Sequence, residues 1–518
     1  MARRWLAASL AVVMLAGCGI GDAKGGGDGD SGYRVGGHEL TEGEFRYGLA
    51  PQRHKDVTLQ PDVVLVEGGA EAVRSVTADG LTWTIDANAK GAADLVPGKV
   101  MFATARGVGR VVDAQRSGDT VAVTIAPVEF TEVVRDGTFA SDGAVPLDNI
   151  LSYSSEGALW TDPQAATEAG AAEPSPAGRS LPVGRALRRA PADRERVEMP
   201  RPVAGAPKTT KTNGFEVTPT CCANGVGADL RYDDNEIRIQ ASVKLIMKSP
   251  SARFHLAVSG GKITIAELQV YGGGGIKIDV SAASAIGHLR QLDRTFTIPI
   301  DFSVPVGLIL GIPFTLSANQ EVLVKTAFSA KDGNVRASGE YAIGGTLGFG
   351  YRDGNWGVHK VDGPHIKSSL LESVRGVSVG ANGIVLDFKT NFRLGIGALG
   401  FSAGLNFGLV VSTGVARGSA LSQFFPLVPG ERSLDCKGAS LTVDTTYNVG
   451  YSIPAIVQKV VNFFLRVFNA KPIARSGESP TRRPARTSSA GRSTSRRAAR
   501  PDPTAPAWYM CMPGHGCA

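Results

Sequence analysis

The chain has 518 residues, of which 43% are hydrophobic, and this length and composition are typical of a globular protein of two or three domains. Its formal net charge is +7, but residues 471–502 alone carry nine basic and two acidic residues and so account for the whole excess. Because the rest of the chain is neutral overall, the composition argues against nucleic-acid binding by the folded parts, and we expect no nucleic-acid partner.

Residues 1–17 are predicted to be an export signal. Arg3 and Arg4 precede an apolar stretch that runs from Leu6 to Gly17. This stretch suits a signal peptide and is shorter than the about 20 residues that span a bilayer. An ordinary signal peptide with an incidental cysteine, or a twin-arginine signal, is the alternative interpretation.

The end of the apolar stretch, Leu15-Ala16-Gly17-Cys18, resembles the lipobox of bacterial lipoproteins. The resemblance implies cleavage before Cys18 and a diacylglyceryl group on its sulfur. It therefore predicts a lipid-anchored protein, carrying fatty acids such as palmitate, on the extracytoplasmic face of the cell membrane. The Gly/Asp-rich residues 18–36 are predicted to form a flexible tether.

Two segments of different composition follow the tether. Residues 37–150 contain short alternating apolar runs between turn signals, as in "GRVVDAQRSGDTVAVTI", and are predicted to form a small β module. Residues 155–213 are rich in Ala, Pro and Arg without apolar periodicity, and are predicted to be a disordered linker between two separately folding bodies.

Residues 214–470 show the strongest pattern in the chain. Apolar residues alternate with polar ones through "EIRIQASVKLIMK" and again from Ile384 to Ala398, with Asp387, Lys389, Asn391 and Arg393 on the opposite face and a break allowed at Gly395 or Gly397. Such long strands must hide one apolar face. The chain is therefore predicted to be mainly β, with long antiparallel strands in a curved sandwich or partly closed barrel, plus the smaller N-terminal β module.

A helix is predicted near the end of this segment, where Ser452 suits the N-cap, Pro454 suits the first turn and "AIVQKVVNFFLRVF" follows. Its wide apolar face favours packing on the sheet. A cavity for a lipid-like ligand between helix and sheet is the sharper alternative.

Residues 471–518 form an Arg/Ser/Pro tail that is predicted to be disordered. It is either merely solvated or attracted to anionic lipids or polymers of the cell envelope.

The remaining five cysteines are candidates for disulfide bonds, which are the usual state of cysteine outside the cytoplasm. They are Cys221, Cys222, Cys436, Cys511 and Cys517. Cys436 is a candidate partner for Cys221 or Cys222, and Cys511 for Cys517. Cys511, His515 and Cys517 also suit a metal. Five cysteines leave the connectivity open.

Two further motifs suggest chemistry only weakly. Residues 376–380, Gly-Val-Ser-Val-Gly, match the G-x-S-x-G nucleophile elbow, but a strand is predicted after them where that motif needs a helix. His359, Asp362 and His365 offer at most three metal ligands in one loop. We therefore assign no catalytic residue, metal or cofactor.

These observations predict a lipid-anchored envelope protein with a non-catalytic binding or structural role and an unidentified protein partner. Two alternatives stay open. One is a carrier of a lipid-like ligand in the large β domain, and the other is a surface hydrolase with an unrecognised site.

Overall fold

The computed structural model describes the following residues: 33–35, 38–78, 80–145, 150–154, 198–199, 201–205, 208–221, 225–234, 237–284, 292–328, 333–352, 355–358, 361–376, 380–398, 401–420, 434–452 and 485–487. Within them the protein is mainly β, as predicted. The helices described are α1 (Glu42–Tyr47), α2 (Phe130–Val133) and α5 (Leu370–Ser373), with the 3-10 turns η1 (Gly69–Ala72) and η2 (Ala92–Asp94). None of the helices among these residues is long and apolar enough to cross a membrane.

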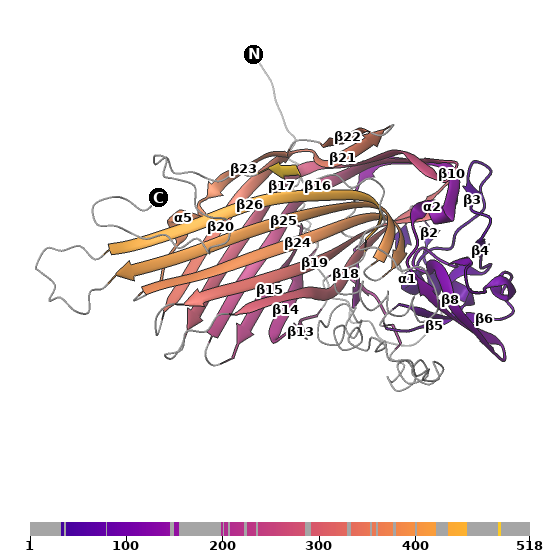
Figure 1. The fold of residues 1–518 in the computed structure, drawn as a ribbon, viewed down its shortest axis with the longest axis horizontal. Coiled ribbons are helices and arrows are strands. Elements are labelled where there is room, and N and C mark those ends of the chain that lie inside the picture. The colour runs from indigo at the N-terminus through magenta and orange to yellow at the C-terminus, as the bar shows by residue number, and fades with distance from the viewer. Residues whose placement is uncertain are drawn as a thin grey trace, which may run out of the picture.

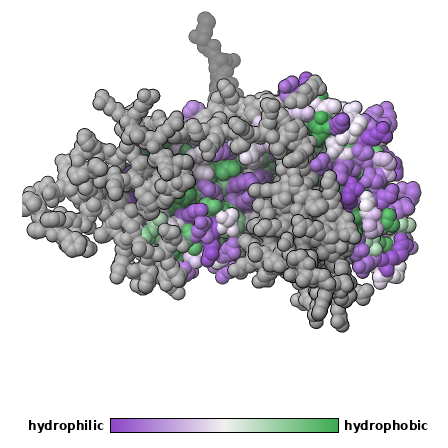
Figure 2. Space-filling model, in the orientation of Figure 1, coloured by the Kyte–Doolittle hydropathy of each residue, from purple (hydrophilic) through white to green (hydrophobic). Residues whose placement is uncertain are grey.

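The N-terminal module, at the indigo end of Figure 1, is built on a six-stranded sheet that we call sheet I. Trp83, Ile85 and Val123 are fully buried on alternate positions of its strands, which confirms the predicted two-residue pattern. On the face shown in Figure 2, hydrophilic side chains gather over this module. In order across sheet I, the strands are β4 (Val63–Leu65), β7 (Val100–Phe102), β8 (Val108–Ser117), β9 (Thr120–Ala126), β6 (Thr82–Asp86) and β5 (Val73–Val76). A short pair, β1 (Arg34–Val35) and β2 (His38–Glu39), precedes them.

Two larger antiparallel sheets form the rest of the described structure. Sheet II contains β13 (Thr210–Thr212), β14 (Phe215–Thr220), β15 (Gly225–Asp233), β16 (Ile237–Ser259), β17 (Lys262–Ser284), β20 (Asn334–Gly345) and β23 (Val361–Ser368), joined by β3 (Thr58–Leu59), β10 (Val134–Ala144), β21 (Leu347–Arg352) and β22 (Asn355–Val358). Sheet III contains β12 (Val203–Ala204), β11 (Leu151–Ser154), β18 (Asp293–Ile309), β19 (Ile312–Phe328), β24 (Gly380–Ala398), β25 (Phe401–Ala420), β26 (Leu434–Ser452) and β27 (Ala485–Thr487).

The predicted long strands are present. β24 pairs with β25 in an unbroken register through Gly395 and Gly397, so neither glycine interrupts it. β16 is longer than the predicted run and bends at Ser249, whose φ is +46° and next to which the register with β17 shifts. The bend coincides with Pro250, which has no backbone N–H to donate to a neighbouring strand.

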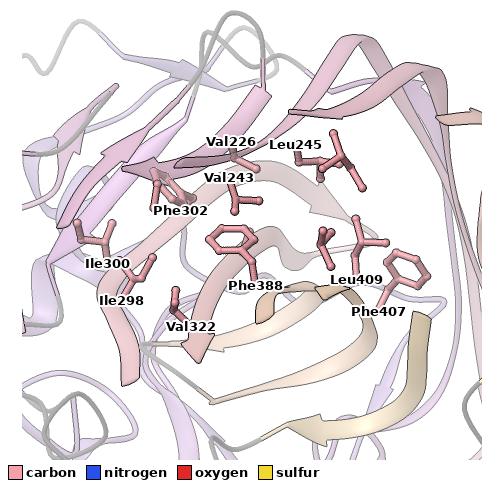
Figure 3. Close-up of a cluster of buried hydrophobic side chains, with 14 of the residues drawn as sticks. Val226, Val243, Leu245, Ile298, Ile300, Phe302, Val322, Phe388, Phe407 and Leu409 are labelled. Carbon is pink, nitrogen blue, oxygen red and sulfur yellow. The ribbon is translucent and has the colours of Figure 1, made fainter. Parts of the chain in front are cut away.

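Sheets II and III face each other as a sandwich, and their apolar faces meet. In Figure 3, Val243 and Leu245 from sheet II and Val322, Phe388 and Leu409 from sheet III point into one shared interior. Aromatic pairs join the sheets at both sides of this interior: Phe215–Phe296 with ring centroids 5.0 Å apart and Phe349–Tyr447 at 5.2 Å. The predicted fold class is therefore confirmed in its sandwich form.

The module and the sandwich share their sheets, which differs from the predicted separate folding of two bodies. β10 adds to sheet II beside the distal half of β16, from Gly137↔Val258 to Ala144↔Ser251, and β11 adds to sheet III beside β18. The predicted linker also supplies two strands, β12 and β13. The composition of the linker shows correctly that it cannot form a hydrophobic core of its own. It does not show that a short part of the linker can pair, as a strand, with the edge of a sheet formed by other parts of the chain.

Four phenylalanines join the module to both large sheets. Phe314 of β19 has its ring centroid 5.8 Å from Phe130 of α2, 5.3 Å from Phe139 of β10 and 5.3 Å from Phe254 of β16. Phe130 and Phe139 also meet edge to face at 5.6 Å. Such tilted aromatic contacts add to the large area that each buried ring removes from water.

Several predictions fall on residues outside the described ranges. They concern the signal peptide, the tether except residues 33–35, most of the linker, and the helix after Ser452. The tail also lies outside, apart from Ala485–Thr487, which pair with β26 as β27, so these three residues are ordered where disorder was predicted.

Replacement of Phe314 by alanine tests whether this cluster holds the parts together. We expect Phe314→Ala to lower the free energy of unfolding by about 3–5 kcal/mol, because it empties a fully buried position at which three elements meet. Denaturant unfolding of the purified chain measures the loss. Val385→Ala is the control, since Val385 is 43% exposed and its truncation should cost less than about 0.5 kcal/mol. Equal losses in the two variants would contradict a joining role for the cluster.

Candidate functional site

The candidate site begins at a tight turn between β7 and β8. The Thr104 hydroxyl donates to the Tyr47 carbonyl (2.6 Å) and accepts from the Gly107 amide (2.9 Å), so the turn is tied to α1. A Cβ at Gly107 would come within 2.9 Å of the Trp83 ring, so this position has no room for a side chain. The turn directs the side chain of Arg106 into the protein, where it is only 4% exposed.

Arg106 lies over the ring of Tyr153, with its guanidinium carbon 3.1 Å from the ring centroid. Tyr153 belongs to β11, and its hydroxyl donates to the Phe45 carbonyl of α1 at 3.1 Å. Burial raises the pKa of Tyr153 and lowers the pKa of Arg106, whereas the interactions of Arg106 with Tyr153 and Asp301 act in the opposite direction on its pKa. The stack therefore fixes a cation between the module and sheet III.

A polar row continues from Tyr153 across sheet III. Tyr153 is the register partner of Asp301, Asp301 of Asn319, and Asn319 of Asn391. Register partners project to the same side of a sheet, so the row lies on the face away from the sandwich interior. Asn391 Nδ2 donates to Asn319 Oδ1 at 3.1 Å.

Arg393 lies two residues beyond Asn391 on β24 and is a second buried cation. Only 3% of it is exposed, although the alternation of β24 predicted simply that it faces away from the core. Burial lowers its pKa, and the carboxylates of Asp301 and Glu321 oppose that effect. The amide of Gly397 on the same strand donates to the carbonyl of Ala105 at 2.8 Å, which fixes this end of β24 beside the turn that carries Arg106.

A small pocket, which we call the junction pocket, lies where the module meets the β18–β19 hairpin. Its volume is about 10 Å³, enough for about one water molecule. The module and β11 contribute Leu40, Glu44, Arg106 and Tyr153 to its lining, and the hairpin contributes Ser303 and Phe314.

Carboxylates lie near both buried arginines. Asp301 acts on both guanidinium groups, and Glu321 acts on Arg393 but also forms an ion pair with Lys389 at 3.5 Å. Glu44 lines the junction pocket itself. In addition, Arg106 Nη1 and Arg393 Nε have no hydrogen-bond partner within the described part of the chain. A buried guanidinium with an unfilled donor is suited to hold an anionic group.

The predicted cysteine sites are only partly described. Cys221 is disulfide-bonded. Cys436 lies on β26 with Gly418 as its register partner. Cys18, Cys222, Cys511 and Cys517 lie outside the described ranges, so their lipidation or pairing stays a prediction.

The weak motifs do not form a described site. Gly376 follows α5 and Gly380 begins β24, so a strand does follow the G-x-S-x-G match, and residues 377–379 lie outside the described ranges. Asp362 and His365 belong to β23, where the side chain of His365 is exposed, and His359 is not described. Among the residues that the structure describes, no three His, Cys, Asp or Glu side chains gather as metal ligands.

The residues of the junction were not recognised from the sequence. Arg106 stands in a Gly-rich turn and Arg393 on a polar strand face, and solvent-exposed arginines are common in both settings. The burial of these arginines could have been predicted only from the pairing of β11 with β18. The pattern of residues within a single segment does not reveal that pairing.

Family comparisons cover most of the described structure. Residues 196–481, more than half of the chain, match the family model described as domain of unknown function DUF8402, and residues 43–136 match domain of unknown function DUF8403. The chain belongs to the DUF8402 family. The DUF8402 match covers the two large sheets except β3, β10, β11 and the last strand, β27, and the DUF8403 match covers α1, sheet I and the start of β10. No curated protein and no solved structure is significantly similar to the chain.

Neutralising Asp301 tests the electrostatics of the junction. We expect Asp301→Asn to lower the free energy of unfolding by about 3–5 kcal/mol, because it leaves two buried guanidinium groups without the carboxylate they share. Denaturant unfolding measures the loss. Asp293→Asn is the matched control on the same strand, since Asp293 is 63% exposed in its ion pair with Lys325 and should cost less than about 1 kcal/mol. If the free energy of unfolding falls equally little in both variants, the buried network does not stabilise the junction.

Proposed function

We propose that this protein is exported, is lipid-anchored through Cys18 to the extracytoplasmic face of the bacterial cell membrane, and acts there by binding rather than by catalysis. The observation that carries the location is the disulfide bond of Cys221, because disulfides persist in oxidising compartments. It agrees with the lipobox-like Leu15–Cys18.

The position of the anchor orients the molecule. Cys18 precedes Tyr33 by 15 residues, and Tyr33 is already buried in the core of the module. If the intervening residues form the predicted tether, their end-to-end distance is about 20 Å. On that prediction the module is the part nearest the membrane, and the long strands of the sandwich extend from the module (Figure 1).

The binding role is supported by the chemistry of the junction pocket. Arg106 offers hydrogen-bond donors and a positive charge, neither of which makes it a nucleophile or a general base at neutral pH. The Arg-rich residues 471–502 would add attraction to anionic lipids or polymers of the envelope.

Metabolic labelling tests the anchor. We expect radiolabelled palmitate to appear on the wild-type chain and to be absent from Cys18→Ser, which should also remain uncleaved. Cys221→Ser is the control. It removes a cysteine that is already disulfide-bonded, so this variant should carry as much palmitate as the wild type. Labelling of Cys18→Ser at the wild-type level would contradict the proposed attachment.

A specific observation in the sandwich interior favours a second function, that of a carrier for a lipid-like ligand. Gln320 is fully buried on the face of β19 that also bears Val322, and its register partner is Thr390. Neither Nε2 nor Oε1 of Gln320 has a hydrogen-bond partner among the described residues. A carboxamide in an apolar interior needs such a partner, and the polar end of an amphipathic ligand would supply one.

Gln320→Leu distinguishes a carrier from a closed core. If the interior is filled only by protein, we expect the variant to be more stable by about 1–3 kcal/mol, because the cost of an unpaired buried amide disappears. If the interior carries a ligand, solvent extraction and mass spectrometry should detect lipid in the wild type and much less in Gln320→Leu. Thr442→Val on the opposite face of sheet III is the control and should leave the extracted lipid unchanged. Absence of lipid from the wild-type extract would reject the carrier function.

A further inference from the structure

We infer that the junction pocket binds one small monovalent anion, such as chloride, between Arg106 and sheet III. The inference rests on the proposed binding role and specifies the ligand. Two observations from different aspects of the structure support it: the unfilled donor of a buried cation and the size of the pocket.

The unfilled donor is Nη1 of Arg106. Its guanidinium group is held in place by the Tyr153 ring, 3.1 Å from the ring centroid, so it has little freedom to turn toward another acceptor. The donor is buried and has no protein partner within the described residues. Folding has already removed the water around this cation. The desolvation of Arg106 therefore does not reduce the free energy of anion binding.

The charges near the pocket set the charge of the ligand. The buried guanidinium group of Arg106 favours an anion. Glu44 also lines the pocket, where its Oε2 accepts from the Thr41 amide at 3.0 Å and lies 3.0 Å from His38 Nε2. Its carboxylate disfavours a ligand with more than one negative charge.

The volume of the pocket sets the size of the ligand. A volume of about 10 Å³ holds one water-sized group, which suits a chloride ion. Acetate, phosphate and sulfate are larger, and Glu44 in the pocket lining would repel the second charge of phosphate or sulfate. We therefore expect chloride to bind in preference to acetate and phosphate.

Bound there, the anion would connect parts of the chain that are far apart in sequence. The pocket is lined by α1, the Arg106 turn, β11 and the β18–β19 hairpin. The anion would thus strengthen the docking of the module on sheet III, beside the phenylalanine cluster, since Phe314 lines the same pocket.

Thermal unfolding of the purified full-length chain in detergent provides the test. Chloride would replace gluconate at constant ionic strength, with acetate and phosphate series in parallel. We expect the midpoint to rise by about 2–4 °C as chloride goes from well below its dissociation constant to about 100 times above it. Acetate and phosphate should have no more effect than gluconate.

Two variants locate the effect. Arg106→Met should abolish the chloride-dependent shift. Arg110→Met should keep the shift. Arg110 lies on β8, is partly exposed and forms ion pairs with Asp62 and Glu132. If chloride raises the unfolding midpoint equally in the wild type and in Arg106→Met, the inference that the anion binds at Arg106 is wrong.

Crystals grown with bromide give a second measurement that does not depend on any variant folding. An anomalous peak within hydrogen-bonding distance of Arg106 Nη1 is expected, and a water molecule there instead would overturn the inference. Stabilisation by phosphate but not by chloride would reject the monovalent ligand and leave the binding role standing. If none of the anions acts, the binding role of this pocket fails as well, whereas the lipid anchor is decided separately by palmitate labelling.

Discussion

The contact of Phe314 with Phe130, Phe139 and Phe254 is the interaction on which the described architecture depends. It brings together one strand of each large sheet, the strand that the module lends to sheet II, and the short helix before that strand. Two sheets with strands this long need a common point that sets their relative position, because the apolar contacts along the interior are non-directional. The four rings provide a point of defined shape at the module end.

The same end of the molecule contains the buried charges. Phe314 faces the apolar interior, whereas Asp301, Asn319 and Arg393 lie on the opposite face of sheet III, which the module approaches through Ala105 and Gly397. Apolar packing on one face thus positions a polar network on the other. A buried network of this kind is expensive unless its charges are compensated, which is why the unpaired donor of Arg106 is informative about a ligand.

Strand content and the sandwich were readable from the sequence because side-chain alternation is a local property. The run from Ile384 to Ala398 and the pattern around Val243 predicted half-buried strands, and both are present. The contribution of β10 and β11 to the large sheets was not readable, since their partners β16 and β18 lie more than 100 residues away in the sequence. The linker composition then suggested two independent bodies, where the chain has shared sheets.

The sequence by itself determined which residues alternate, where a lipidation motif stands, and that the positive charge is concentrated in one segment. Only the tertiary structure decided which arginines are buried. Arg106 and Arg393 have ordinary local sequences, and their environment arises when β11 pairs with β18 and the Arg106 turn meets the end of β24. Burial of a charge depends on what covers it, and what covers these two arginines comes from parts of the chain that are distant in sequence.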